Sequence, residues 1–244
     1  MKGKREQIYQ LLLGILLVCA LPVMALLGYW ACRYSYYGTV DYSIRNILVK
    51  DTAWKHILVF LLAVAVVWGL DRMLARTKRM QQEKICLGVL ILTVVAAFIL
   101  GILYILKNPY FPEGDQIGVA AFAAYAREGN YVMLGPGGYV GMYQQQKGLG
   151  ALYEILFTFF GNFNYTSAKI VHVIWWLFAI LAGYGFLKLN TDRAVFRILY
   201  CAMLLGCMPF LLYLPYIYGD ILSVSFCMIL FWAVSAYEHY EQKR

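Results

Sequence analysis

The run ICLGVLILTVVAAFILGILYIL, from Ile85 to Leu106, carries no charged residue. A helix needs about 20 apolar residues to cross the hydrocarbon core of a bilayer, and this run is long enough. Five further runs have a similar composition and are interpreted as spans: Ile8–Tyr29, Ile57–Leu74, Ala168–Leu187, Ala194–Tyr213 and Ile221–Tyr237. We therefore expect an all-α, polytopic transmembrane protein with about six spans.

The composition of the whole chain agrees with this interpretation. Hydrophobic residues make up 62% of the 244 residues and charged residues only 14%, whereas a soluble domain carries about 25% charged residues. The net charge of +8 is concentrated beside the apolar runs. That placement is typical of the positive-inside rule rather than of a nucleic-acid-binding face. The sequence thus favours the lipid bilayer as a partner and predicts no nucleic-acid partner.

The basic residues also predict which side of the membrane each loop occupies. With six spans, four basic clusters fall on one face, which the rule identifies as the cytoplasm: Lys2–Arg5, Arg72–Lys84, Lys188–Arg197 and Lys243–Arg244. The apolar run Leu149–Phe160 has only 12 residues, too few for a core of about 30 Å, so we expect an interfacial or re-entrant helix there. We predict a multi-pass protein of the cell membrane, of the bacterial plasma-membrane type, with both termini in the cytoplasm.

This topology divides the chain into two parts. Residues 1–84 form an N-terminal two-span hairpin with a cytoplasmic basic loop, and residues 85–244 form a core. The core consists of one span, an exoplasmic acidic loop over residues 107–167, and three further spans. Exoplasmic juxtamembrane helices are expected within that loop.

Two aspartates are predicted at the exoplasmic face. Asp115 precedes an amphipathic stretch, residues 116–128, with apolar residues at Ile117, Ala121, Ala124 and Tyr125. Asp220 precedes the last span. Each aspartate fits the N-cap of a helix. Each is also a candidate catalytic carboxylate, because apolar surroundings at a bilayer surface tune proton affinity for base chemistry.

Polar and aromatic residues accompany these aspartates. The Gly-rich stretch at residues 135–143 lacks the spacing and the Lys-Ser/Thr ending of a nucleotide-binding P-loop. The following glutamines, Gln144 to Gln146, suit hydroxyl-rich ligands, and Lys147 is either a phosphate contact or a snorkelling charge. Tyr213, Tyr216 and Tyr218 fit either an aromatic belt or a wall against a sugar. His172 is interpreted as a packed residue rather than a ligand.

Three segments together resemble a known family. They read PYFPEGDQIGVAAFAAYAREGNYVML, GGYVGMYQQQKGLGALYEILFTFFG and, between Pro209 and Asp220, PFLLYLPYIYGD. The first two resemble the first exoplasmic loop of GT-C-type membrane glycosyltransferases, in the bacterial branch related to protein mannosyltransferases. The third resembles the end of the following hairpin in that family. The likeness covers about residues 85 to 237 and implies a GT-C-like core.

The resemblance also implies roles for individual residues. GDQ, at residues 114–116, matches the acidic motif of the family, so Asp115 is the expected base or acceptor-binding group, and Asp220 the second carboxylate of the cleft. The segment GGY…YQQQKG matches a GGY…YPxQxG pattern, with Gln144 where proline is frequent. The expected substrate-binding residues are Gln116, Tyr139, Tyr143, Gln146, Lys147 and Tyr218. The metal requirement stays open, and a divalent cation at Asp220 is one alternative.

The function implied by the resemblance is transfer of a sugar from a polyprenyl-phosphate-linked donor to an exoplasmic glycan, lipid or protein. Family members are usually much longer, so the likeness implies the N-terminal part of such an enzyme, with further spans supplied by a continuation or a partner chain. One alternative is a non-catalytic subunit or scaffold of cell-envelope assembly. A small transporter is a second alternative, which is disfavoured because no predicted span carries an ionisable residue at mid-membrane.

Overall fold

The computed structural model describes residues 52–108 and 110–243, two short strands that precede them, and separate helical positions between residues 11 and 29. Contacts divide the chain into two compact units, residues 1–70 and 71–244. The predicted first span, Ile8–Tyr29, lies largely outside the described residues.

The first unit contains a structure that the expected all-α class lacks. Strands β1 (Tyr34–Tyr37) and β2 (Ile47–Lys50) pair antiparallel, with Tyr34 opposite Lys50. β1 is rich in Tyr and β2 contains Ile and Val, residues that favour extended backbone. Each strand is too short to show a clear period in the sequence. Helix α2 (Ala53–Ala75) starts in this unit.

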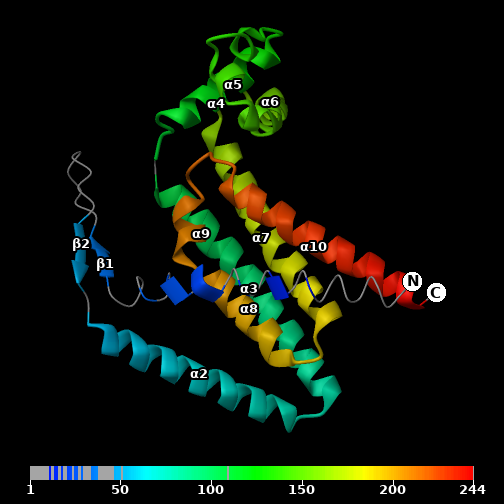
Figure 1. Ribbon diagram of the computed structural model, residues 1–244. Helices are drawn as coiled ribbons and strands as arrows, with labels where there is room; N and C mark the ends of the chain where they lie inside the picture. Colours follow the sequence, from blue (N-terminus) through cyan, green and yellow to red (C-terminus); the bar gives the residue numbers. More distant parts are fainter. Residues whose placement is uncertain are drawn as a thin grey trace. The chain divides into compact units, whose positions relative to one another are not determined.

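The second unit is a helical bundle with a smaller layer of helices at one end (Figure 1). The bundle helices are α3 (Arg79–Lys107), α7 (Tyr165–Asn190), α8 (Ala194–Gly206), α9 (Met208–Tyr213) and α10 (Asp220–Lys243). Buried apolar side chains from α3, α7, α10 and the α9–α10 connection form its core: Ala97, Ile105, Val173, Trp176, Ile180, Leu214 and Ile221.

Four of the described helices are long and apolar enough to cross a membrane, namely α2, α3, α7 and α10. The expectation of a helical membrane protein is therefore confirmed in this coarse form. The count of six spans and the GT-C-like core stay predictions.

The predicted span Ala194–Tyr213 is not one continuous helix. It is interrupted at Cys207, which lies between α8 and the short helix α9. Pro209 lies at the start of α9. Proline lacks the amide hydrogen that a continuous helix requires, and its ring clashes with the preceding turn. The hydrophobic run is as long as expected, but it forms two helices, of 13 and 6 residues, instead of one.

The layer at the end of the bundle is formed by the segment between α3 and α7 (Figure 1). Its elements are α4 (Asp115–Arg127), the 3₁₀ turn η1 (Val132–Leu134), α5 (Tyr139–Met142), η2 (Gln144–Gln146) and α6 (Lys147–Phe160). Helix α6 confirms the short apolar helix expected near residues 149–160. It has 14 residues and is not among the helices long enough to span.

The predicted amphipathic helix exists as α4, but its buried face differs from the expected one. Ile117 and Tyr125, two apolar positions of the predicted amphipathic pattern, are 47% and 44% exposed. The buried side chains are instead Gln116, Val119, Ala120, Phe122, Ala123, Ala124 and Ala126. Mostly small side chains face α6, and small side chains permit a close approach of two helices that larger ones would prevent.

Charged groups gather at the opposite end of this unit. Arg79 pairs with Asp192 at 2.8 Å, which joins the start of α3 to the α7–α8 turn. Arg197 binds Glu83 through two hydrogen bonds of 2.7 and 2.9 Å. The α4–α6 layer and the α9–α10 connection lie at the other end (Figure 1). The bundle thus has two chemically different ends, and which of them faces the cytoplasm stays a prediction.

Candidate functional site

The two aspartates of interest each begin a helix. Asp115 is the first residue of α4, and Asp220 is the first residue of α10. The N-cap of α4 is Gly114, which has φ 56°, a backbone conformation that glycine adopts without strain. The N-cap of α4 is therefore the residue before Asp115, and our prediction of Asp115 as the N-cap is wrong. The Asp115 carboxylate is available for another contact. Asp220 likewise stands in the first turn.

The Asp115 carboxylate is contacted by a residue of the α9–α10 connection. The Tyr218 hydroxyl donates a hydrogen bond to Asp115 Oδ2 at 2.8 Å, across 103 residues of sequence. Partial burial raises the pKa of Tyr218, and the hydrogen bond to Asp115 and the charges of Asp115 and Asp220 raise it further. Tyr218 therefore stays protonated and acts as a donor. Tyr218 and Asp220 line one cavity, so the hydrogen bond from Tyr218 to Asp115 joins the segment that carries Asp115 to the segment that carries Asp220.

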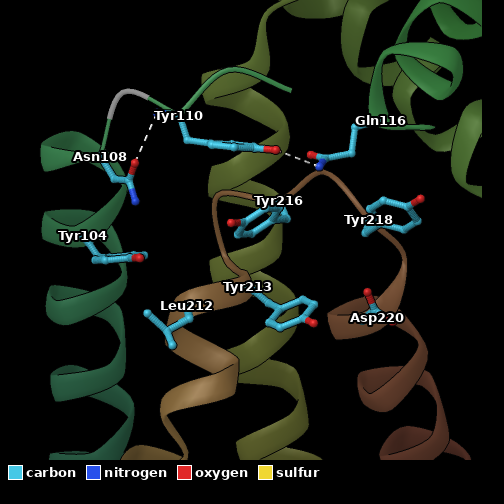
Figure 2. Close-up of a pocket in the computed structure, with 9 residues that line it drawn as sticks. All are labelled: Tyr104, Asn108, Tyr110, Gln116, Leu212, Tyr213, Tyr216, Tyr218 and Asp220. Atoms are coloured by element: carbon cyan, nitrogen blue, oxygen red, sulfur yellow. Dashed lines mark hydrogen bonds between the residues drawn. The ribbon is translucent and has the colours of Figure 1, made fainter. Parts of the chain in front are cut away.

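Gln116 fixes the relative position of the two segments. Its side-chain oxygen accepts a hydrogen bond from the Ile217 backbone N–H at 3.1 Å, across 101 residues of sequence. Its side-chain nitrogen donates to the Tyr110 hydroxyl at 3.0 Å (Figure 2). Gln116 is only 5% exposed. One N–H of the amide remains for a ligand, so Gln116 is mainly the residue that joins α4 to the α9–α10 connection.

Tyrosines line the cavity beneath this junction. Its volume is about 660 Å³, and Figure 2 shows the side chains that line it: Tyr104, Asn108, Tyr110, Gln116, Leu212, Tyr213, Tyr216, Tyr218 and Asp220. The ring centroids of Tyr110 and Tyr216 are 4.6 Å apart, and those of Tyr213 and Tyr216 are 5.7 Å apart. A wall of this kind offers apolar ring faces and hydroxyl groups together.

A second cavity, of about 620 Å³, shares Tyr218 and Asp220 with the first. Other residues that line it come from η2, α6, α7 and α10, and include Gln145, Gln146, Leu152, Trp175, Ser223 and Phe226. Asp220 is thus placed between two hollows, one dominated by tyrosine and one by amide and apolar groups.

The remaining predicted residues lie in different surroundings. Tyr139 packs against Gly118 of α4 and makes a ring contact with Tyr143 at 4.9 Å. Burial raises the pKa of Tyr139, and the Asp115 carboxylate raises it further, so Tyr139 lies within electrostatic range of Asp115. Tyr143 and Lys147 are exposed, and neither lines the two cavities.

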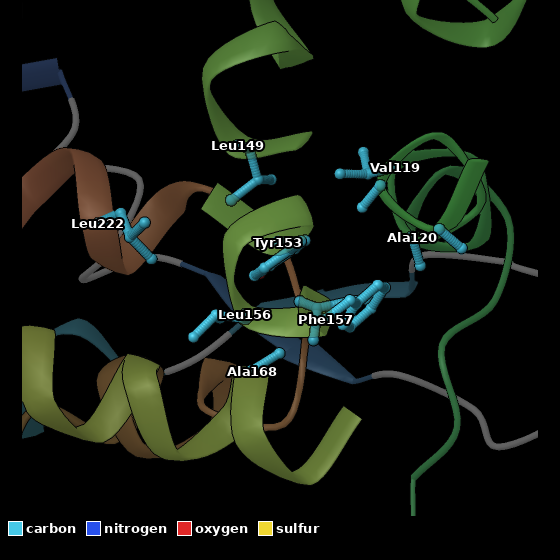
Figure 3. Close-up of a cluster of buried hydrophobic side chains, with 11 residues drawn as sticks. Val119, Ala120, Leu149, Tyr153, Leu156, Phe157, Ala168 and Leu222 are labelled. Atoms are coloured by element: carbon cyan, nitrogen blue, oxygen red, sulfur yellow. The ribbon is translucent and has the colours of Figure 1, made fainter. Parts of the chain in front are cut away.

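The α4–α6 layer supports the site from behind. Side chains from α4, α6, α7 and α10 form a buried cluster (Figure 3), which includes Val119, Ala120, Leu149, Tyr153, Leu156, Phe157, Ala168 and Leu222. The Tyr153 hydroxyl lies 2.9 Å from His172 Nε2, and His172 Nδ1 lies 3.3 Å from the Leu214 carbonyl oxygen. His172 is fully buried and is the packed residue that we expected. It ties the α9–α10 connection to α6 and α7.

Sequence reasoning did not select Tyr104, Asn108 or Tyr110. Tyr104 and Asn108 lie one turn apart at the end of α3, and Tyr110 follows the helix. A tyrosine and an asparagine at the end of a span are common at membrane interfaces, so the local pattern gave no reason to single them out. Among the described residues, no three His, Cys, Asp or Glu side chains form a group that could hold a metal ion.

Comparisons with known proteins do not assign this site. No protein-family model, no curated protein and no solved structure matches the chain.

Proposed function

We propose that the protein is a membrane glycosyltransferase, or the N-terminal module of one, which transfers a sugar from a polyprenyl-phosphate-linked donor to an exoplasmic acceptor. The observation that carries the proposal is the hydrogen bond from the Tyr218 hydroxyl to Asp115. This bond joins the segment that carries Asp115 to the segment that carries Asp220, and Tyr218 and Asp220 both line the tyrosine-lined cavity.

The chemistry requires few groups. The acceptor hydroxyl oxygen attacks the anomeric carbon of the sugar, the bond from that carbon to the phosphate oxygen breaks, and the lipid phosphate leaves with the bonding electrons. The hydroxyl proton passes to a carboxylate. Because phosphate is a good leaving group, one general base is sufficient, in contrast to hydrolysis by a pair of carboxyl groups.

Asp115 suits the role of the base. Its side chain is exposed and is oriented by the Tyr218 hydroxyl at Oδ2, which leaves the other oxygen and its lone pairs for the acceptor proton. Asp220 faces both cavities and suits contact with sugar hydroxyl groups or with a divalent cation. The tyrosines supply faces and hydroxyls for a pyranose ring.

The test is sugar transfer from a polyprenyl-phosphate donor in membranes that contain the full chain, with any partner chain co-expressed. Asp115→Asn keeps the acceptor oxygen for Tyr218 but removes the ability to take a proton. We expect the rate to fall on the order of 10²–10⁴-fold, the usual contribution of a general base. Asp192→Asn is the matched control, because Asp192 is an exposed aspartate at the opposite end of the bundle. Equal rates for both variants and the parent would favour the non-catalytic subunit instead.

A further inference from the structure

A buried lysine lies outside the tyrosine-lined cavity. Lys169, in α7, is only 6% exposed, and its Nζ donates a hydrogen bond to the Tyr110 carbonyl oxygen. It forms no ion pair with a carboxylate among the residues that the structure describes. A buried ammonium without an anion is costly. Two of its three donors remain after the bond to Tyr110.

Lys169 lines a separate cavity of about 340 Å³ between the end of α3 and the start of α7. The polar residues that line it with Lys169 are Asn108, Tyr110, Asn164, Tyr165 and Thr166. These groups supply amide and hydroxyl hydrogen bonds around one positive charge. Asn108 and Tyr110 line this cavity and also the tyrosine-lined one, so the two cavities are neighbours.

The cavity also has an apolar edge. Phe111 and Leu106, which line it, are 72% and 70% exposed. Leu106 is in the last turns of α3, a helix long enough to span a membrane. A ligand that fits both the positive charge of Lys169 and the apolar edge has an anionic head and an apolar chain. The start of α7 borders the cavity, and a helix N-terminus adds a favourable field for an anion.

We propose that this cavity binds the phosphate group of a membrane lipid, with Lys169 donating to the phosphate oxygens and the lipid chain leaving past Leu106 and Phe111. Binding of the phosphate requires no sugar transfer. The identification of the lipid as a polyprenyl phosphate rests on the proposed function.

The test measures equilibrium binding of decaprenyl phosphate to the full chain purified in a neutral sugar detergent. Lys169→Gln is expected to raise the Kd at least about tenfold, as for the loss of one charge-assisted hydrogen bond. Lys188→Gln removes an exposed charge from the other end of the same helix and is expected to leave the Kd within about twofold. Equal effects of the two variants would overturn the proposal.

A second pair of variants keeps the test independent of the folding of Lys169→Gln. Phe111→Glu places a carboxylate at the cavity edge and should raise the Kd for decaprenyl phosphate by repulsion. Phe159→Glu makes the same change at a side chain that is 77% exposed on α6 and should have little effect. Equal binding by these two variants would also contradict the proposal.

Three further ligands separate the possible sources of the phosphate. Neutral decaprenol should bind at least about tenfold more weakly than decaprenyl phosphate, and equal binding would show that the phosphate is not recognised. Inorganic phosphate should bind far more weakly than the lipid, and equal binding would refute the lipid as ligand. Binding of phosphatidylglycerol, but not decaprenyl phosphate, through Lys169 would support the phosphate site and refute the polyprenyl carrier of the proposed function.

Discussion

Gln116 shows how much of the site depends on single side chains. It satisfies the buried N–H of Ile217 and the hydroxyl of Tyr110 at the same time. Gln116→Leu keeps a similar volume but leaves that N–H without a partner. We expect the free energy of unfolding to fall by about 1–3 kcal/mol, the cost of an unsatisfied buried donor. Denaturant-induced unfolding in detergent measures this change in the free energy of unfolding.

The control for this variant is Gln145→Leu, because Gln145 is an exposed glutamine in the neighbouring η2 turn. Its effect should stay within about 0.5 kcal/mol, as for most surface changes. If both variants unfold at the same denaturant concentration, the bonds of Gln116 contribute nothing to stability.

At the same scale, the sequence indicates some site residues and not others. Asp115 and Asp220 stand where local signals predict the start of a helix, and those helices exist. The contact of Asp115 with Tyr218 depends instead on two loops that meet across 103 residues. No local period or motif encodes such a meeting, so Tyr110 and Tyr104 could not be selected from the sequence.

At the scale of elements, α4 and α6 pack through a close approach at Gly150. A side chain there would collide with the ring of Phe122, whereas Gly148, in the same helix, has open space around it. Gly150→Ala should therefore destabilise the protein by about 1–3 kcal/mol, the cost of overpacking. Gly148→Ala should stabilise it by up to about 1 kcal/mol through helix propensity.

Thermal unfolding of the two glycine variants in detergent measures the difference. Because both substitutions replace Gly by Ala near the start of α6, their propensity effects are similar, and their difference reports mainly the contact with Phe122. Equal melting temperatures would mean that α4 and α6 do not approach each other at Gly150.

Elements also show where patterns in the sequence are insufficient. Long apolar runs predict α3, α7 and α10 well, because hydrophobic length is a property of the run itself. The interruption at Cys207 follows from Pro209, yet prolines also occur inside spans, where neighbouring helices compensate. The apolar pattern of α4 did not identify its buried face, because Ala120 and Ala123, and not the larger Ile117 and Tyr125, pack against α6.

For the whole molecule, the central claim is that Asp115 and Asp220 face the same exoplasmic compartment in one site. The bundle places the α4–α6 layer and the α9–α10 connection at one end, and the Arg79–Asp192 pair at the other (Figure 1). The positive-inside rule predicts that the second end lies in the cytoplasm. The claim therefore predicts opposite accessibility for exposed residues at the two ends.

The most direct test uses single cysteines at positions 115, 220 and 192, in a background without the native cysteines, and a membrane-impermeant thiol reagent applied to intact cells. All three native side chains are exposed, so the protein itself does not shield them. We predict labelling at positions 115 and 220, and labelling at position 192 only after the cells are opened. Labelling at position 192 in intact cells, or at only one of positions 115 and 220, would contradict a single exoplasmic site.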